Sequence, residues 1–281
     1  WLLVDAEQTA PLEAWLQRMR FMLRVEIADR SAEFATIGWL ASSAPDATPA
    51  ALAAVAASGA GHELTWRDPW PEIVTGGVQY ATVDEHPGAT WFWRETLVPR
   101  SGLEALAATV AEGAVQPAGL LAAEALRIAA WRPRLATEVD ERSIPHELDW
   151  MRSAVHLSKG CYRGQETVAK VHNLGHPPRR LVFLHLDGSD AVLPAPGDEV
   201  VVAGDAEAAA VGRVTSVANH HEWGPVALAV VKRQLDPAAP LAVRTADGEV
   251  AASAETIVSP DAGAAVGRVR LPRLGARSRT A

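Results

Sequence analysis

The sequence predicts an α+β fold that ends in a small antiparallel β-barrel. Three observations support this fold class. The opening elements follow the order strand, helix, strand, strand; residues 117–131 carry a helical stripe of apolar side chains; and residues 179–258 form short β runs separated by turns. The opening order is typical of a helix packed on a sheet, whereas repeated short strands with turns are typical of a barrel.

The first 61 residues contain the opening elements. Trp1–Asp5 is predicted to be a strand, and a helix is predicted from Pro11 because apolar residues recur at helical spacing as far as Met19. Two further strands are expected at Leu23–Ala28 and Phe34–Leu40. Residues 41–61 are rich in Ala, Ser, Pro and Gly, which leaves a loop and a weak helix both open.

Two helices are predicted in the next part of the chain. Ser101 is the expected N-cap of a helix over Gly102–Glu112, and a second helix runs from Pro117 to Trp131. Residues 132–150 are polar and irregular, with Ile144–Glu147 as an extended link. The strands expected over residues 62–98 are His62–Trp66, Val78–Val83 and Thr90–Val98.

The chain changes character after Pro177-Pro178. Apolar and polar residues alternate over residues 180–186, and turns such as Asp247-Gly248 follow, which suits antiparallel strands. Residues 259–281 hold five arginines against one aspartate, which predicts a disordered basic tail. The expected barrel strands are Leu181–Leu186, Glu199–Ala203, Ala210–Ala218, Val226–Val231, Leu241–Arg244 and Glu249–Ala252.

These elements predict a domain organisation in four parts. Residues 1–150 form α+β lobes, residues 151–178 a linking segment, residues 179–258 the barrel and residues 259–281 the tail. The first residue is Trp rather than Met. We therefore expect the chain to begin partway into a longer protein, with an upstream portion belonging to the first lobes.

Composition excludes several classes of protein. The 281 residues are 48% hydrophobic, enough for a sizeable core. A net charge of −8 argues against a surface that grips nucleic acid directly, and no apolar run reaches the roughly 18 residues that a membrane span needs. A single cysteine forms no intramolecular disulfide, which favours the reducing cytoplasm. No Walker loop, G-x-G-x-x-G or H-E-x-x-H motif occurs.

The single cysteine, Cys161, lies in the run Lys159-Gly-Cys-Tyr-Arg-Gly-Gln-Glu166. Gly160 and Gly164 bracket it, and glycine permits the positive φ angles of a sharp turn. The basic neighbours Lys159 and Arg163 would favour the thiolate, which is the nucleophilic and metal-binding form of cysteine. The residues alone therefore indicate a candidate reactive thiol.

Other interpretations of Cys161 stay open on the residues alone. A cysteine buried in a glycine-lined turn is nearly as well supported, because free cysteines are among the most buried residues. A metal site with His172 and His176 is disfavoured because the spacing fits no familiar site. A Cys–His hydrolase is disfavoured further because no Asn or Asp can be assigned to orient the base.

The run around Cys161 resembles the signature K-G-C-Y-x-G-Q-E of the YgfZ family, with all seven fixed positions matched. Ile144-Pro145-x-Glu147 and Arg179-Arg-Leu181 are similar to the family's flanking segments. This family is related to the T-protein of the glycine cleavage system and to mitochondrial iron–sulfur assembly factors. The resemblance implies a multi-lobed, T-protein-like folate-binding fold with the small barrel at its C-terminal end.

The resemblance also implies a function. The protein would be a cytoplasmic, tetrahydrofolate-binding accessory factor for maturation or repair of iron–sulfur client proteins, including tRNA-modifying radical enzymes, and Cys161 would be its candidate catalytic residue. A folate has a flat pterin and an anionic tail, which need aromatic faces and basic groups. The cofactor-binding residues expected on these grounds are Lys159, Tyr162, Arg163, Gln165, Glu166, Arg127 and Trp131.

One departure from the T-protein pattern bears on the alternative function, a folate-dependent aminomethyltransferase. Where that pattern has Glu and Gly, this chain has Ala129 and Trp131. The lost carboxylate disfavours aminomethyl transfer. Trp131 would stack on a ligand or, as the favoured alternative, fill the core at a helix end. A folate-independent interaction module is a third possibility, and the oligomeric state stays open.

Overall fold

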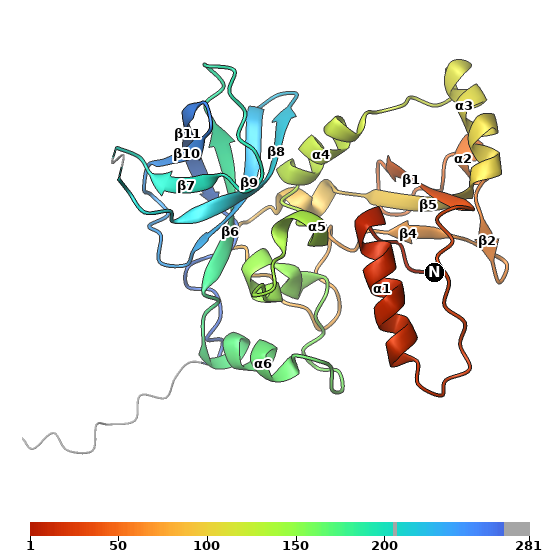
Figure 1. Cartoon of the computed structure of the whole chain (residues 1–281), viewed down its shortest axis with the longest axis horizontal. Helices are drawn as coiled ribbons and strands as arrows, with labels where there is room; N and C mark the ends of the chain where they lie inside the picture. The colour runs from red at the N-terminus through yellow and green to blue at the C-terminus, as the bar shows by residue number, and fades with distance from the viewer. Residues whose placement is uncertain (205–206, 267–281) are drawn as a thin grey trace, which may run out of the picture. The chain divides into compact units, whose positions relative to one another are not determined.

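The structure is a computed structural model that describes residues 1–204 and 207–266 (Figure 1). The chain forms two compact units. Unit 1 comprises Trp1–Glu72 and Glu85–Ala136, whereas unit 2 comprises Ile73–Asp84 and the chain from Thr137 onward. The units divide after Ala136, whereas the predicted boundary lies at residue 150. The short segment 73–84 belongs to unit 2, although the residues before and after it belong to unit 1.

Unit 1 contains a three-stranded antiparallel sheet of order β1-β5-β4, a two-stranded ribbon of β2 and β3, and four α-helices among its described residues. Its elements are α1 (Ala6–Met19), β1 (Phe34–Leu40), α2 (Ala50–Ala53), β2 (Ser58–Gly59), β3 (His62–Glu63), β4 (Thr65–Arg67), η1 (Pro87–Thr90), β5 (Trp93–Pro99), η2 (Arg100–Gly102), α3 (Leu103–Ala111) and α4 (Leu120–Ala129).

Several predictions for unit 1 are confirmed. The strand at Phe34–Leu40 has the predicted bounds, and β5 lies within the predicted run Thr90–Val98 except for its last residue. The helices over Gly102–Glu112 and residues 117–131 form as α3 and α4. The predicted cap at Ser101 is wrong, because Gly102 occupies the N-cap position and makes no side-chain cap bond.

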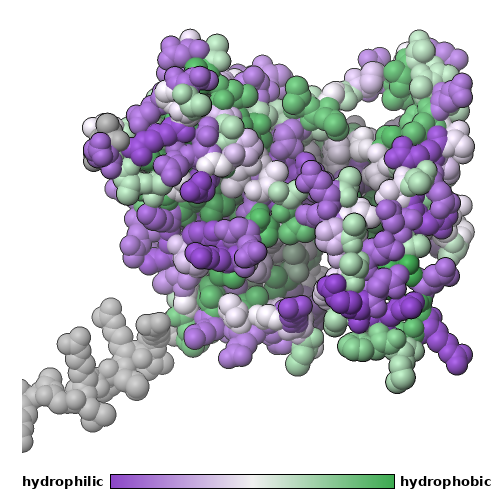
Figure 2. Space-filling model, in the orientation of Figure 1, coloured by the Kyte–Doolittle hydropathy of each residue, from purple (hydrophilic) through white to green (hydrophobic). Residues whose placement is uncertain are grey.

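Two predicted strands of unit 1, Trp1–Asp5 and Leu23–Ala28, are wrong. Neither segment pairs with another strand among the described residues, and a strand without a partner leaves its backbone groups unsatisfied. Side chains of the second segment are exposed, with Leu23 at 66%. Helix α1 begins before the predicted Pro11 and buries no residue, and hydrophobic surface shows near its lower end in Figure 2.

Unit 2 is built on a closed barrel with the strand order β10-β11-β6-β9-β8-β7. Every neighbouring pair is antiparallel, as predicted. All six predicted strands are present, so the α+β class with a C-terminal antiparallel barrel is confirmed. The strands are β6 (Arg179–Leu186), β7 (Glu199–Val202), β8 (Gly212–His220), β9 (Gly224–Lys232), β10 (Leu241–Thr245) and β11 (Gly248–Thr256).

The barrel interior is apolar because one face of each strand carries aliphatic residues. Val182, Leu184 and Leu186 alternate along β6 and point into this core with residues of the other strands. Gly212 permits close strand packing, because a Cβ there would lie 2.6 Å from the carbonyl oxygen of Val230. On the opposite face of β6, Leu181 and Phe183 are also buried, so this strand is apolar on both faces.

The remaining elements of unit 2 precede the barrel. They are α5 (Leu135–Glu138, which begins in the last residues of unit 1), η3 (Pro145–Leu148), η4 (Trp150–Arg152) and α6 (Gln165–Leu174). The predicted extended link at Ile144–Glu147 is wrong, because most of it forms the 3-10 helix η3. The predicted strand at Val78–Val83 is also wrong, since these residues run beside η4 without forming a strand.

The end of the chain is described only in part. Residues 259–266 contact α6, where the amide of Ala265 donates to the carbonyl of His172 at 2.8 Å. All five arginines of the predicted tail lie beyond residue 266 and fall outside the described residues. Among the helices of the described residues, none has the length and apolar character needed to cross a membrane.

Candidate functional site

The Cys161 run forms a turn that leads directly into α6. Gly164 is the N-cap of this helix and has a φ of 83°, a left-handed conformation that glycine adopts without strain. The amide of Gln165 donates to the carbonyl of Tyr162 at 3.2 Å and closes the turn. The turn therefore requires glycine at position 164, as the sequence indicated.

Cys161 is a free and exposed cysteine. Its exposure contradicts the alternative in which it fills a buried position. Because the thiol lies on the surface of unit 2, it is accessible to a ligand, a metal cluster or another protein. A reactive cysteine needs an electropositive environment and access to solvent, and the exposure of Cys161 provides the access.

The other residues of the run carry basic, aromatic and amide groups next to Cys161 in the chain. Lys159 Nζ lies 5.1 Å from the ring centroid of Tyr162, a cation–π contact. Tyr162 and Gln165 are half-buried, whereas Arg163 and Glu166 are exposed. Within the described parts of the chain, Arg163, Gln165 and Glu166 make no side-chain hydrogen bond or ion pair, which leaves these groups available for a ligand.

The segment 73–84 runs beside the residues that approach the turn. The amides of Val74 and Val78 donate to the carbonyls of Arg152 and Met151 at 2.9 and 3.0 Å. The amide of Leu157 donates back to the carbonyl of Gly76 at 2.9 Å. These backbone bonds hold the chain just before Lys159.

Two side chains hold the helix that follows the turn. His146 Nε2 lies 3.0 Å from the carbonyl oxygen of Val168 in α6, and the hydroxyl of Tyr80 lies 2.9 Å from His172 Nδ1. Burial lowers the pKa of His146 to about 4 and also lowers the pKa of His172. Both imidazoles are therefore neutral at pH 7, and His146 donates its Nε2 proton to the helix carbonyl.

Asp149 anchors the backbone of the same segment. Its Oδ1 accepts a hydrogen bond from the amide of Tyr80 at 2.5 Å. Burial raises the pKa of Asp149 to about 7, against the lowering effects of its hydrogen bonds and of Arg152. Burial and the nearby Asp149 raise the pKa of Tyr80 to about 12, so its hydroxyl stays protonated.

A small cavity of about 270 Å³ lies at the C-terminal half of α6. Tyr80 and His172 form one wall, with Gln79 and Thr82 beside them. Ser259, Asp261 and neighbouring residues form the other wall. The cavity is mostly apolar, with hydroxyl, imidazole and carboxylate groups at its edges.

Arg179 connects the start of the barrel to the segment before η4. Its guanidinium donates to Asp140 at 2.6 Å and to Glu147 at 2.8 Å. Glu147 is almost wholly buried, whereas half of the Asp140 side chain is exposed. The hydrogen bonds from Arg179 lower the pKa of Asp140. Asp140 therefore stays ionised at neutral pH, and Arg179 bonds to both carboxyl groups.

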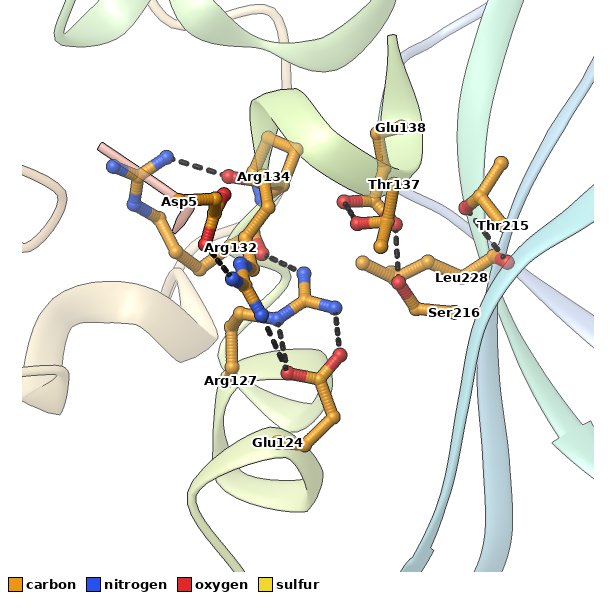
Figure 3. Close-up of polar contacts among 11 residues, drawn as sticks. Asp5, Glu124, Arg127, Arg132, Arg134, Thr137, Glu138, Thr215, Ser216 and Leu228 are labelled. Atoms are coloured by element: carbon orange, nitrogen blue, oxygen red, sulfur yellow. Dashed lines mark hydrogen bonds and ion pairs between the residues drawn. The ribbon is translucent and has the colours of Figure 1, made fainter. Parts of the chain in front are cut away.

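A second contact joins the barrel to α5. The hydroxyl of Ser216 in β8 donates to Glu138 Oε1 at 2.5 Å, and Thr137 donates to the other carboxylate oxygen (Figure 3). A cavity of about 440 Å³ lies beside these residues and is lined mainly by β8, β9 and residues 137–140. The charged side chains that line this cavity form hydrogen bonds or ion pairs with other residues of the chain, so the cavity offers no distinct chemistry.

Arg127 and Trp131 belong to unit 1, whereas the signature run belongs to unit 2. The guanidinium of Arg127 pairs with Glu124 and donates to the carbonyl of Arg132 (Figure 3). Trp131 is 1% exposed, and its ring packs 5.5 Å from that of His86. Both side chains therefore have structural contacts within unit 1, and Trp131 presents no accessible face to a ligand.

The histidines of the disfavoured metal site make other contacts. His172 bonds to Tyr80, and His176 Nδ1 lies 2.9 Å from the carbonyl oxygen of Ala262. Across residues 1–204 and 207–266, no three His, Cys, Asp or Glu side chains are grouped so as to hold a metal ion.

Three residues that hold α6 or the segment beside it are not predicted from the sequence: Tyr80, His146 and Asp149. His172 is named in the sequence analysis only as a ligand of the disfavoured metal site. The stretch Ile144-Pro145-x-Glu147, which includes His146, was noted for its resemblance, so it carried a signal for that residue. Tyr80 carried none, because it lies about 80 residues before Cys161 in a run predicted to be a strand.

Comparison with known proteins supports the assignment of the barrel. Residues 179–270 match the family model of the glycine cleavage T-protein C-terminal barrel domain. A curated relative from Arabidopsis thaliana, named "Putative transferase At1g60990, chloroplastic", is 32% identical over 130 residues. That match covers 44% of this chain and 27% of the relative, so the chain spans about a quarter of the relative's length.

These two comparisons support a glycine cleavage T-protein-like family. The barrel that the strands build is the part that the family model describes. The assignment to YgfZ within this wider group stays a prediction that rests on the Cys161 run. Residues 179–270 are thus similar to the C-terminal barrel domain of the glycine cleavage T-protein.

Proposed function

We propose that this chain is part of a tetrahydrofolate-binding accessory factor for the maturation or repair of iron–sulfur proteins, including tRNA-modifying radical enzymes. The observation that carries the proposal is the seven-position signature around Cys161, which forms an exposed turn in a T-protein-like chain. The factor would act in the cytoplasm, and its partners would be folate and iron–sulfur client proteins.

The residues of the signature run fit a folate. When bound, tetrahydrofolate supplies a reduced pterin and an anionic glutamate tail. Lys159 and Arg163 offer positive charge to the carboxylates, Tyr162 offers an aromatic face, and Gln165 and Glu166 offer hydrogen-bonding groups to a pterin edge. All five lie within one short run.

Arg127 and Trp131 fit a folate less well. Arg127 would have to leave Glu124, and Trp131 would have to leave the core of unit 1. Their role in folate binding therefore stays a prediction, and the signature run carries the proposal.

Cys161 would act as the thiolate, either by holding a cluster iron transiently or by exchanging thiols with a client. Its exposure supports a role toward a large partner as well as toward a small ligand.

Calorimetric titration of tetrahydrofolate into the protein tests the folate proposal. Binding in the micromolar range or tighter supports it. No detectable binding overturns both the accessory-factor proposal and the transferase alternative, because both require folate. Lys159→Ala should weaken binding, whereas Lys232→Ala, which removes an exposed lysine at the end of β9, serves as the matched control.

Complementation tests the thiol. Cys161→Ser is expressed in a strain that lacks the endogenous factor, and the activity of a radical tRNA-modifying client is measured. We expect loss of rescue. The matched control is Ser158→Ala, an exposed residue three positions away whose side chain makes no hydrogen bond among the described residues. Full rescue by Cys161→Ser would rule out a chemical role for the sulfur.

Aminomethyl transfer is the second candidate, and the word transferase in the relative's name favours it. The Ala129 and Trp131 positions disfavour it, because the expected carboxylate is missing. Turnover of an aminomethyl donor in the presence of tetrahydrofolate would establish the transferase, and binding without turnover would support the accessory factor.

A further inference from the structure

Helix α6 has few contacts of its own to fix its position. It is ten residues long, it has no side-chain N-cap bond, and Val168 is its one buried residue. An isolated helix of this length is marginal in water. Its place in unit 2, and that of the Cys161 turn at its start, must therefore depend on contacts with other segments.

The segment 73–84 contacts the chain on both sides of the turn. Before the turn, the carbonyl of Gly76 accepts from the amide of Leu157, two residues ahead of Lys159. After the turn, the hydroxyl of Tyr80 bonds to His172 in α6. The turn thus spans two points held by the same short segment.

The first contact is close enough to demand glycine. Gly76 has a φ of 77°, and a Cβ there would lie 2.5 Å from the His156 ring. At Gly77 a Cβ would lie 2.6 Å from the carbonyl oxygen of Arg152. Two consecutive glycines therefore let this segment lie directly against the approach to the turn.

The second contact is a single side chain with a fixed backbone. The Tyr80 ring stacks on His172 with centroids 6.0 Å apart and an interplanar angle of 15°. Tyr80 is 6% exposed, and its amide is held by Asp149. The hydroxyl therefore bonds to His172 from a buried residue whose backbone is held in place.

Residues 259–266 hold the far end of α6. The amides of Ala265 and Val266 donate to the carbonyls of His172 and Asn173, which the helix itself leaves unsatisfied. Gly263 has a φ of 97°, and a Cβ there would collide with the carbonyl oxygen of Gly175. The contact with residues 259–266 limits movement of α6 along its axis, whereas the hydrogen bond from Tyr80 holds the side of the helix.

We propose that Tyr80 is a positioning residue for the signature turn, acting through its hydrogen bond to His172 from a segment that also holds Leu157. Its consequence for folate binding rests on the proposed function. Its consequence for the turn itself does not, and can be measured without any ligand.

Tyr80→Phe is the direct test, because it removes the hydroxyl and keeps the ring. Cys161 is the chain's one cysteine, so a nitroxide attached there reports on this turn alone. We expect a larger mobile component in the spectrum of Tyr80→Phe. Hydrogen exchange of the α6 amides should accelerate about fivefold, the factor that corresponds to one neutral hydrogen bond.

The matched control is Thr215→Val, which removes one hydroxyl hydrogen bond, to the carbonyl of Leu228, in the barrel of the same unit. This variant should lower overall stability similarly and leave both the label mobility and the α6 exchange unchanged. If the two variants loosened the turn equally, Tyr80 would contribute only to overall stability, and the proposal would be overturned.

His172→Leu removes the imidazole that bonds to Tyr80 and provides a second route if Tyr80→Phe folds poorly. Where both single variants fold, the double variant should loosen the turn no more than His172→Leu alone, because both changes remove the same bond. Additive effects would show that the two residues act separately and would overturn the proposal.

Folate binding separates this inference from the proposed function. If the unmodified protein binds tetrahydrofolate, Tyr80→Phe should weaken the affinity about two- to fivefold, because the competent position of the turn is less populated. If the unmodified protein does not bind, the proposed function fails, and the label and exchange measurements still decide whether Tyr80 positions the turn.

Discussion

The barrel and the signature helix of unit 2 are stabilised in different ways. In the barrel, each strand pairs with two neighbours around a core of aliphatic side chains such as Leu184 and Val243, both fully buried. Helix α6 buries Val168 alone and is held by hydrogen bonds to His146, Tyr80 and residues 265–266.

This difference separates the contacts that stabilise the fold from the contacts that set the geometry of the signature turn. Apolar burial is large and non-directional, so it stabilises the barrel without specifying one orientation of a surface turn. Hydrogen bonds contribute about 1 kcal/mol each but are directional. We therefore expect barrel changes to alter global unfolding, and changes around α6 to alter the turn more than global stability.

The largest expected effect is in the barrel core. Leu184→Ala should lower the free energy of unfolding by about 3 kcal/mol through lost burial and a cavity. Urea unfolding followed by circular dichroism measures it. His185→Ala, at the adjacent and exposed residue of β6, should change stability by less than about 0.5 kcal/mol. Similar losses for the two variants would contradict the assignment of the core.

Arg179 tests whether a polar contact can matter as much as the core. Arg179→Gln leaves the buried Glu147 without its guanidinium partner, which should cost about 2 kcal/mol in urea unfolding. Arg244→Gln is the control, because Arg244 contacts the partly exposed Glu199 and Glu249 on the barrel surface. A loss at Arg179 no greater than that at Arg244 would show that the buried contact adds nothing.

The buried carboxyl of Asp149 makes the free energy of unfolding depend on pH. Its pKa is raised from 3.8 to about 7, so between these values the unfolded carboxyl is ionised while the folded one is protonated. Stability from this group is full below about pH 4 and is lost as pH rises towards 7. From pH 5 to 6 the loss is about 1.4 kcal/mol.

Asp149→Asn removes this titration and keeps an oxygen that accepts from the Tyr80 amide. Urea unfolding at pH 5 and pH 6 should show a smaller decrease in stability for the variant than for the unmodified protein. His146, whose pKa is lowered, acts in the opposite sense in both proteins, so the comparison cancels it. Parallel pH profiles would place the carboxyl in an ordinary ionised state.

The smallest expected effect on stability is at the thiol. Cys161→Ser changes one exposed atom and should alter the free energy of unfolding by less than about 0.5 kcal/mol. Thermal unfolding measures this directly. A large loss would mean that the sulfur packs in the fold, and the failure of rescue expected for this variant would then have a structural cause.

The fold was predictable where the signal is local. Alternating apolar residues and turn sequences located all six barrel strands, and helical spacing located α3 and α4. Prediction failed at Trp1–Asp5, Leu23–Ala28 and Val78–Val83, because a strand needs a partner and local propensity does not supply one.

The site was predictable in part. The signature run identified Cys161 and its neighbours, and the structure places them together on one turn because they are adjacent in the chain. The roles of Arg127 and Trp131 depended on contacts that no local pattern carries. Arg127 pairs with Glu124, and Trp131 is buried beside His86.

The sequence by itself determined the barrel and the left-handed turn at Gly164, since each follows from residues close together in the chain. Only the tertiary structure decided that Cys161 is exposed and that Tyr80, which lies 92 residues earlier in the chain, reaches His172. The physical reason is that burial and side-chain hydrogen bonds depend on which distant segments meet, and the geometry of the signature turn depends on such meetings.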